Sequence, residues 1–237
     1  MSALAGQVAL VTGASGGIGG AIAEALAASG AHVLITGRDT RSLEAVEERI
    51  FAAGGSATIA PVDLADGDGI ARLAAAVSAR WKALDVLVHS AAVLPELTAV
   101  KDIEQTALSR ALTVNLLATQ ALIARFDALL RASSAGRFVY LTTSVATQPR
   151  AFWGAYAASK AGAEALVDCY AQETRNISNL RVAIVDPGAT RTAMRAKAYP
   201  GEDPATVKLP GVVAERIVAL LGEQFASPHR ERINQSR

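Results

Sequence analysis

Short, mostly apolar runs alternate with longer segments rich in Ala and Leu along most of the chain. Within the short runs, polar and apolar residues show little alternation, which is typical of parallel strands that helices cover on both faces. This pattern predicts strands at Val8–Val11, His32–Thr36, Ala57–Pro61, Val86–His89, Phe138–Leu141 and Val182–Val185.

The longer segments between these runs have the composition and spacing of helices. We expect helices at Ile18–Ser29, Ser42–Ala53, Gly69–Trp81, Ile103–Arg131, Tyr156–Asn176 and Val212–Leu221. Strands that alternate with helices through short connections indicate an α/β fold with one doubly wound parallel sheet. Because no repeat or linker interrupts the order, residues 1–237 are expected to form a single domain.

One long irregular stretch follows the last predicted strand. It runs from Thr190 to Gly211 and contains Pro200, Pro204 and Pro210. A loop of this length in a compact domain is usually functional. We therefore predict a substrate lid at 190–211.

Composition excludes several classes of protein. A chain of 237 residues that is 51% hydrophobic can bury one sizeable core, and its net charge of +1 gives no electrostatic case for binding nucleic acid or an acidic membrane. The lone Cys169 excludes an internal disulfide framework. No signal peptide and no apolar run long enough to span a bilayer is evident. We expect a cytoplasmic protein without a metal site.

A glycine-rich turn follows the first predicted strand, at Thr12-Gly13-Ala14-Ser15-Gly16-Gly17-Ile18-Gly19. Glycines let the backbone approach a phosphate closely, and the following helix N-terminus offers free N–H groups. The turn therefore predicts dinucleotide contacts, although it also fits a purely structural turn. The expected contacts are Gly13, Ser15, Gly17, Ile18 and Gly19.

The ends of the next two strands carry charged residues. The second strand ends Thr36-Gly37-Arg38-Asp39. Gly37 stands where an acidic residue would bind the ribose hydroxyls of NAD, and the guanidinium of Arg38 suits the 2′-phosphate of NADP. Alternatively, Arg38 is a solvated charge and Asp39 a helix N-cap. Asp63, with Leu64 beside it, is positioned to accept a hydrogen bond from the adenine amino group, although Asp63 also fits a turn or N-cap.

A tyrosine and a lysine stand four residues apart at the start of a predicted helix. Tyr156 and Lys160 therefore share one helix face. A nearby ammonium, together with a positively charged nicotinamide, would lower the tyrosine pKa from about 10. The phenol could then act as general acid in carbonyl reduction, and its phenolate as base in alcohol oxidation.

Other polar residues sit at strand ends or inside a helix. A hydroxyl in Thr142-Thr143-Ser144 could stabilise charge on a carbonyl oxygen, or simply cap the strand. Asn115, a poor residue for a helix interior, is either a surface residue or marks a distortion that holds a water near Lys160. Pro187-Gly188 is a turn that could place Thr192 against a nicotinamide carboxamide.

Taken together, these residues resemble the short-chain dehydrogenase/reductase family, from about Val8 to Leu221. The motifs stand in family order, and Ser159 also fits the family's Tyr-x-x-Ser-Lys. The resemblance implies a Rossmann-type fold that binds NAD(P) at the carboxyl edge of the sheet. It also implies a catalytic tetrad of Asn115, Ser144, Tyr156 and Lys160, and a cofactor contact at Ala91.

Three features depart from the family pattern. The fourth strand ends His89-Ser90-Ala91-Ala92 in place of Asn-Asn-Ala-Gly, and we interpret His89 as structural. Family spacing to Tyr156 selects Thr143 as the catalytic hydroxyl, whereas the local pattern Thr143-Ser144-Val145-Ala146 selects Ser144. We predict Ser144, with Thr143 as the alternative. The family's seventh strand is expected to be short, around Arg232–Asn234, or missing.

These observations predict an oxidoreductase that transfers a hydride between NADP(H) and a small carbonyl or alcohol, with NAD as the alternative cofactor. The other hypothesis is a catalytically weak NADP-binding sensor or assembly protein of the same fold. The expected substrate pocket contains Leu94, Trp153, Met194 and Tyr199. Because two of the long helices carry Ala and Leu on more than one face, we also expect a homodimer or homotetramer.

Overall fold

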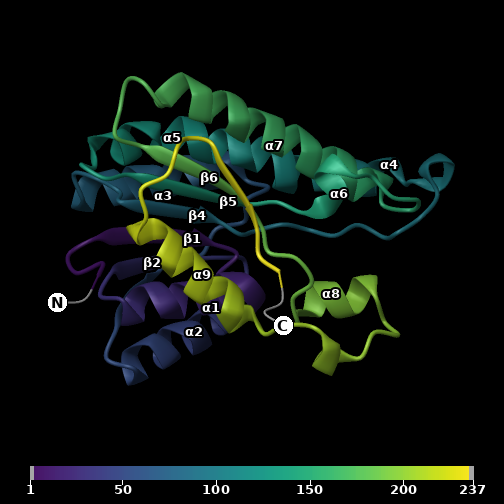
Figure 1. Cartoon of the computed structure of the whole chain (residues 1–237), viewed down its shortest axis with the longest axis horizontal. Helices are drawn as coiled ribbons and strands as arrows, with labels where there is room; N and C mark the ends of the chain where they lie inside the picture. Colours follow the sequence, from purple (N-terminus) through teal and green to yellow (C-terminus); the bar gives the residue numbers. More distant parts are fainter. Residues whose placement is uncertain (1–2, 235–237) are drawn as a thin grey trace.

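A parallel sheet runs through the centre of the computed structural model, which describes residues 3–234 (Figure 1). Its strand order is β3-β2-β1-β4-β5-β6-β7, and every neighbouring pair is parallel. The strands are β1 Val8–Thr12, β2 His32–Thr36, β3 Ser56–Ile59, β4 Val86–His89, β5 Arg137–Leu141, β6 Arg181–Asp186 and β7 His229–Arg232. The predicted doubly wound parallel sheet is confirmed.

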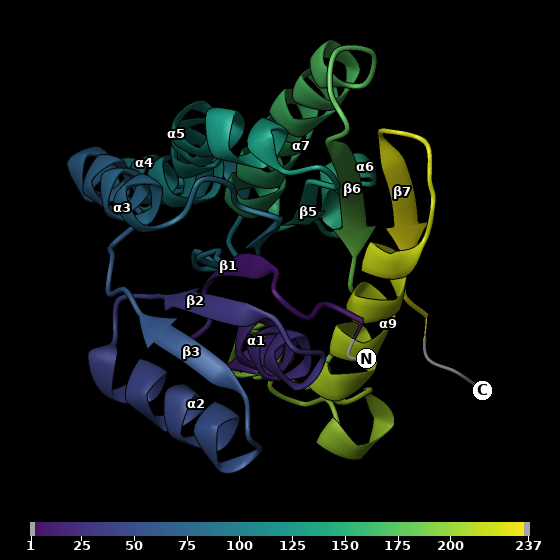
Figure 2. The same ribbon diagram turned by 90° about the vertical axis from the view of Figure 1, so that its left-hand side faces the viewer.

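Helices cover both faces of this sheet, so the fold has three layers (Figure 2). One face is covered by α1 Gly17–Ala28, α2 Thr40–Ala52 and α9 Pro210–Gly222, and the other by α3 Gly67–Arg80, α5 Ala118–Ala132 and α7 Gly154–Thr174. The remaining helices are α4 Gln105–Leu112, α6 Ser144–Thr147 and α8 Ala193–Ala198, with single turns at Val100–Asp102 and Pro204–Thr206.

The three layers explain why the strands are apolar throughout. Successive side chains of a strand point to opposite faces of the sheet. In β1, Ala9 and Val11 pack into the core beneath α1 and α9, whereas Val8 and Leu10 pack into the core beneath α5 and α7. A strand buried on both sides has no solvent-facing position that would favour a polar residue.

The strand order reverses between β1 and β4, which places the ends of these two strands side by side. Thr12 pairs with His89 at the last step of the ladder. The backbone after β1 then lies close to the backbone after β4: a Cβ atom on Gly13 would be only 2.8 Å from the backbone of Ala91. This switch point is where ligands bind in open α/β sheets.

The helix predicted at Ile103–Arg131 is observed as α4 and α5, joined by a π-helical turn at Thr113–Leu117. Asn115 lies within that turn, so the predicted helix distortion is present.

The expectation that no apolar segment is long enough to span a bilayer is wrong for Gln105–Ala132, a run of 28 residues with sufficient length and hydropathy. In this fold one face of the run packs into the core, where the Leu122, Phe126 and Leu130 side chains are fully buried.

Two further segments differ from expectation near the C-terminus. The stretch predicted to be irregular, Thr190–Gly211, contains α8 and the single turn Pro204–Thr206, and its last two residues already belong to α9. The seventh strand is present and short, but it ends at Arg232, where the sequence suggested that it begins. It pairs with β6 in parallel, and Arg230 forms ion pairs with Glu164 and Asp168 of α7.

Candidate active site

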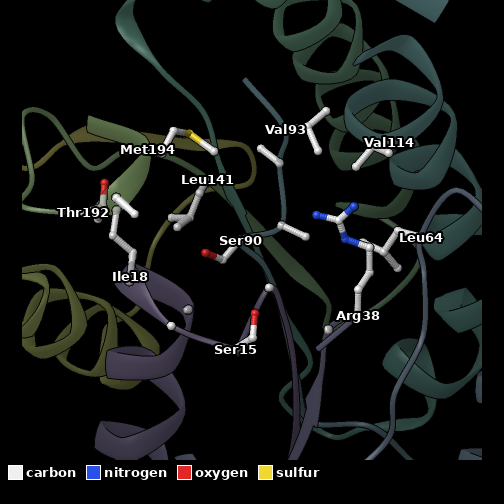
Figure 3. Close-up of a pocket in the computed structure, with 18 of the residues that line it drawn as sticks. Ser15, Ile18, Arg38, Leu64, Ser90, Val93, Val114, Leu141, Thr192 and Met194 are labelled. Carbon is white, nitrogen blue, oxygen red and sulfur yellow. The ribbon is translucent and has the colours of Figure 1, made fainter. Parts of the chain in front are cut away.

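A cavity of about 390 Å³ opens at the carboxyl edge of the sheet, over the switch point (Figure 3). It lies along the glycine turn, the ends of β2 and β4, and the start of α7. Thirteen of the predicted cofactor contacts line it: Gly13, Ser15, Gly17, Ile18, Gly19, Arg38, Asp63, Leu64, Ala91, Tyr156, Lys160, Pro187 and Thr192. The remaining predicted contact, Gly188, lines a smaller cavity next to it.

The glycine turn has the close backbone packing that a phosphate cradle needs. A Cβ on Gly19 would lie 2.3 Å from the carbonyl oxygen of Gly13, so no side chain fits there. Gly13 itself has a φ of +69°, which glycine adopts without strain. The turn therefore leads tightly into α1, whose first three residues line the cavity, an arrangement suited to a pyrophosphate.

Arg38 and Asp63 lie along the same cavity, beyond the glycine turn. Arg38 extends into the cavity beside Leu64 (Figure 3). The N-cap and turn roles considered for this region are present as well. Asp39 is the N-cap of α2 and accepts a hydrogen bond from Ser42. Asp63 accepts a hydrogen bond from the backbone N–H of Ala65 at 3.0 Å. The structural and cofactor roles of Asp63 are compatible, because a carboxylate accepts several hydrogen bonds.

The smaller cavity, of about 130 Å³, adjoins the first. All of the residues proposed for substrate binding line it: Leu94, Trp153, Met194 and Tyr199. The two cavities share a wall formed by Ile18, Thr142, Tyr156, Pro187, Thr192 and Met194. A group held on this wall can contact ligands in both cavities at once.

Tyr156 is nearly buried on this shared wall, with 8% of its surface exposed. Burial raises the pKa of Tyr156 to about 12, and the charge of Asp186 acts in the same direction. The protein's own groups therefore do not produce the expected lowering of the Tyr156 pKa. Without a positive charge from a ligand, the phenol stays protonated at neutral pH.

Lys160 is fully buried beneath the larger cavity. Its Nζ donates a hydrogen bond to the Leu141 carbonyl at 2.6 Å and lies 4.2 Å from the centre of the Tyr140 ring. Burial lowers the pKa of Lys160 to about 7, although the carboxylate of Glu164 acts in the opposite direction. The ammonium is thus fixed at the end of β5, close to losing its proton at neutral pH.

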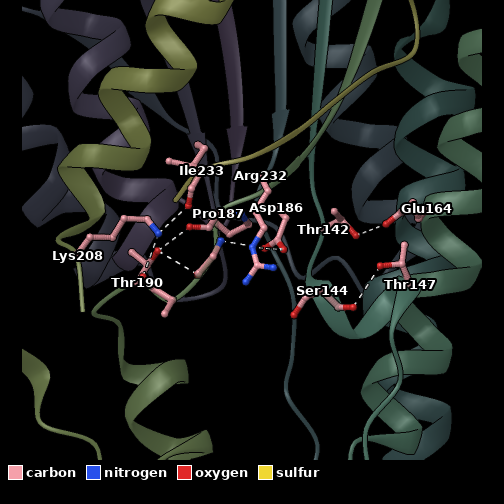
Figure 4. A network of polar contacts seen from close by, with 12 residues as sticks. Thr142, Ser144, Thr147, Glu164, Asp186, Pro187, Thr190, Lys208, Arg232 and Ile233 are labelled. Atoms are coloured by element: carbon pink, nitrogen blue, oxygen red, sulfur yellow. Dashed lines mark hydrogen bonds and ion pairs between the residues drawn. The ribbon is translucent and has the colours of Figure 1, made fainter. Parts of the chain in front are cut away.

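Glu164 was missed in the sequence, whereas Thr142 was one of the three candidate hydroxyls there. Thr142 lines both cavities, and its hydroxyl donates a hydrogen bond to the buried Glu164 (Figure 4). Glu164 also pairs with Arg230. Glu164 lies four residues beyond Lys160 on the same face of α7, so the helical spacing that indicates Lys160 also indicates Glu164.

The structure separates the two candidate hydroxyls. Thr143, two residues beyond the end of β5, is the extended N-cap residue of α6 and lines the smaller cavity with Tyr156. Ser144 begins α6 and lines neither of these cavities within residues 3–234. Its Oγ accepts a contact from Arg150 at 3.4 Å. The geometry therefore favours Thr143 over the predicted Ser144.

Asn115 acts as a buried clamp between two segments. Its Oδ1 accepts from the Val93 N–H at 2.8 Å, and its Nδ2 donates to the Val93 carbonyl at 3.0 Å and to Ser159 at 2.9 Å. Ser159 in turn donates to the Tyr156 carbonyl at 2.8 Å. The surface position considered for Asn115 is wrong, and the amide holds the segment after β4 against the helix that carries Tyr156.

His89 is likewise enclosed in hydrogen bonds. Its Nδ1 lies 2.7 Å from the Thr12 hydroxyl and its Nε2 lies 3.0 Å from the Thr119 hydroxyl. Burial, with a smaller contribution from Lys160, lowers the pKa of His89 to about 3. A neutral, fully bonded imidazole fits the structural role inferred from sequence, holding the ends of β1 and β4 together.

The segment from Thr190 to Lys208 covers the smaller cavity. Thr190 and Lys208 form a bridge at its base, where the Arg191 N–H donates to the Lys208 carbonyl at 2.8 Å. Lys208 Nζ also donates to the Ile233 carbonyl at 2.9 Å (Figure 4). Thr192 caps α8 by accepting from the Arg195 N–H at 3.0 Å and lines both cavities, so α8 begins at the site.

Comparison with known proteins gives consistent matches over nearly the whole chain. Residues 7–203 match the family model for short chain dehydrogenases. The uncharacterized oxidoreductase YciK of Escherichia coli K12 is 34% identical over 220 residues, which cover 92% of this chain and 86% of YciK.

Two crystal structures of short chain dehydrogenases also share the fold. A Shigella flexneri 2a protein in complex with NADP has a TM-score of 0.92 and 33% identity, covering 98% of each chain. An Escherichia coli CFT073 protein in complex with NADPH has a TM-score of 0.91 and 33% identity, covering 97% of this chain and 98% of that one.

Proposed function

This chain belongs to the short-chain dehydrogenase family, and we propose that it transfers a hydride between NADP(H) and a small carbonyl or alcohol substrate. One observation carries the proposal. Tyr156 lies on the wall shared by a cavity that fits a dinucleotide and a smaller, aromatic cavity. A proton donor at that wall can reach the oxygen of a substrate whose carbon faces the cofactor.

The residues of the larger cavity fit NADP(H), which supplies or accepts the hydride when bound. The glycine turn and the N-terminus of α1 would hold the pyrophosphate, and Arg38 the 2′-phosphate. Asp63 would contact the adenine, and Thr192 the carboxamide. The relatives crystallised with NADP and NADPH support this choice of cofactor.

The chain's own groups would manage the proton. Because its pKa is about 12, the Tyr156 phenol is protonated at neutral pH and suited to protonate the substrate oxygen during carbonyl reduction. The Lys160 ammonium would stabilise the resulting phenolate by its positive charge. The Thr143 hydroxyl would donate a hydrogen bond to the same substrate oxygen.

We expect the variant Arg38→Asp to lose the preference for NADPH over NADH. Replacing a guanidinium by a carboxylate removes a charge-assisted contact to the 2′-phosphate and introduces repulsion, so kcat/KM for NADPH should fall by roughly 10- to 100-fold. The measurement is kcat/KM for both cofactors. Arg41→Asp, the same charge change in the first turn of α2, is the control. Equal kcat/KM values for NADPH and NADH in the parent protein would show that Arg38 is a solvated charge.

A catalytically weak NADP-binding sensor or assembly protein remains the second candidate. The altered end of β4, with His89 and Ala92, is the feature that favours it. The position of Tyr156 between the two cavities favours the enzyme. NADPH oxidation across a panel of aldehydes and ketones distinguishes the two, because a sensor would bind NADPH without consuming it.

We also expect the protein to form at least a symmetric dimer through the layer that contains α5 and α7 (Figure 1). Only 33% of the apolar window in Gln105–Ala132 is buried in the single chain. Leu117, 58% exposed, and Leu166, 37% exposed, lie on this layer. A two-fold partner is the natural cover for such a surface. A monomeric mass by light scattering at micromolar concentration would contradict this expectation.

A further inference from the structure

The smaller cavity has aromatic and aliphatic walls. The Trp153 ring lies 6.0 Å from the Tyr156 ring and 5.8 Å from the Tyr199 ring, measured between centroids. Leu94 and Met194 complete the apolar lining. Walls of this kind favour a flat, apolar ligand, because aromatic rings pack best in offset or tilted contact.

Two guanidinium groups stand at this cavity, Arg195 in its lining and Arg150 next to it. Arg150, in the loop between α6 and α7, reaches the Ser144 hydroxyl at 3.4 Å and the Tyr199 hydroxyl at 3.5 Å. These are long contacts to neutral groups, so they hold the guanidinium only weakly. They nevertheless place it next to Thr143 on one side and at the end of α8 on the other.

The charge of Arg150 is not compensated within the described chain. Arg195, which stacks on Tyr199 at 3.7 Å, is neutralised by Glu202. Among residues 3–234, by contrast, neither Arg150 nor Lys197 has a carboxylate within ion-pair distance. Lys197 donates only to the Leu94 carbonyl, at 3.4 Å. Two positive charges without an ion-pair partner among the described residues therefore lie near the aromatic cavity, whereas Asp186, the carboxylate among its lining residues, pairs with Arg232 at 3.5 Å.

We propose that the substrate is an amphipathic carbonyl compound with a flat apolar body and an anionic group, and that Arg150 binds the anion. This inference rests on the proposed function. With the reacting carbonyl at Tyr156 and the body against Trp153, the far end of the substrate would point toward Tyr199, which Arg150 contacts at 3.5 Å. A guanidinium binds a carboxylate or a phosphate through two parallel hydrogen bonds, which its two hydroxyl neighbours cannot match.

The test compares matched aldehydes: benzaldehyde, 4-formylbenzoate and 4-formylphenyl phosphate. In the parent protein we expect kcat/KM to be at least about tenfold higher for one of the anionic aldehydes than for benzaldehyde. The better anion identifies the carboxylate or the phosphate as the preferred group. In Arg150→Gln the anionic-to-neutral ratio should fall to about one, while Arg175→Gln, at the far end of α7, should keep the parental ratio.

A binding measurement makes the inference independent of turnover. The chain has two tryptophans, so a Trp81→Phe background leaves Trp153 as the sole indole reporter in the cavity. Its fluorescence, titrated with 4-formylbenzoate, 4-formylphenyl phosphate and benzaldehyde in the presence of NADP⁺, should show tighter binding of an anion that disappears in Arg150→Gln.

The possible outcomes separate the two proposals. If the parent reduces benzaldehyde as well as both anions, the inference about the anion is wrong and the proposed function stands. If Arg150→Gln lowers kcat/KM equally for all three aldehydes, Arg150 is a structural contact between the loop and α8. If NADPH binds but no aldehyde is reduced, the proposed function fails, and the fluorescence titration still decides whether Arg150 binds the anion.

Discussion

The Tyr156→Phe variant is expected to lose turnover almost completely while it still binds NADPH. Removing the phenolic hydroxyl removes the proton donor on the shared wall, and general acid–base groups typically contribute 10²- to 10⁴-fold to the rate. The dissociation constant for NADPH should change little, because the residues proposed to hold its phosphates and adenine are the glycine turn, Arg38 and Asp63, which line the cavity apart from Tyr156. The two measurements are kcat for carbonyl reduction and NADPH affinity by fluorescence titration.

Tyr170→Phe is the matched control for this prediction. Tyr170 lies on the same helix, and its hydroxyl donates to Asp127 at 2.9 Å, away from both cavities. Its loss should reduce stability slightly and leave kcat at the parental level. A Tyr156→Phe variant that keeps parental kcat would eliminate the proposed mechanism.

The second large effect is expected at Thr143. Thr143→Val keeps the shape of the side chain and removes the hydroxyl that lines the substrate cavity, so kcat should fall by roughly 10²- to 10³-fold, the range found when one oxyanion donor is removed. Ser144→Ala should have a much smaller effect, because the Ser144 hydroxyl faces Arg150 outside the cavity wall.

Thr143→Ser serves as the rescue variant, since it restores a hydroxyl at the same position. We expect it to recover most of the activity lost in Thr143→Val. The contrary result, in which Ser144→Ala loses activity and Thr143→Val does not, would make the local sequence pattern a better guide than the cavity geometry.

The order of elements could be predicted because it depends on local patterns. Runs such as Val8–Val11 are apolar at every position, which only a strand buried on both faces requires. Tyr156 and Lys160 were assigned together because a helix places residues four apart on one face. The glycine turn was identified because its position after the first strand and before a helix is fixed by the order of elements.

Short elements were harder to predict because tertiary contacts stabilise them. The strand β7, His-Arg-Glu-Arg, has no apolar pattern; it is held by its ladder with β6 and by the ion pairs of Arg230 with α7. Similarly, α8 has six residues, and the Thr192 cap and the Arg195–Glu202 pair stabilise it. An isolated helix of this length is unstable in water.

The amino-acid sequence by itself determined the α/β fold, the position of the dinucleotide cavity and the candidate pair Tyr156 and Lys160, because each follows from periodicity along the chain. Only the tertiary structure decided which hydroxyl lines the substrate cavity, that Asn115 is a clamp, and that Arg150 lies beside an aromatic pocket. Those features depend on contacts between segments distant in sequence: Asn115 bonds to Val93 and Ser159, and Arg150 contacts Tyr199. The same packing buries Tyr156 and Lys160 and shifts their pKa values in opposite directions, since burial disfavours whichever form carries the charge.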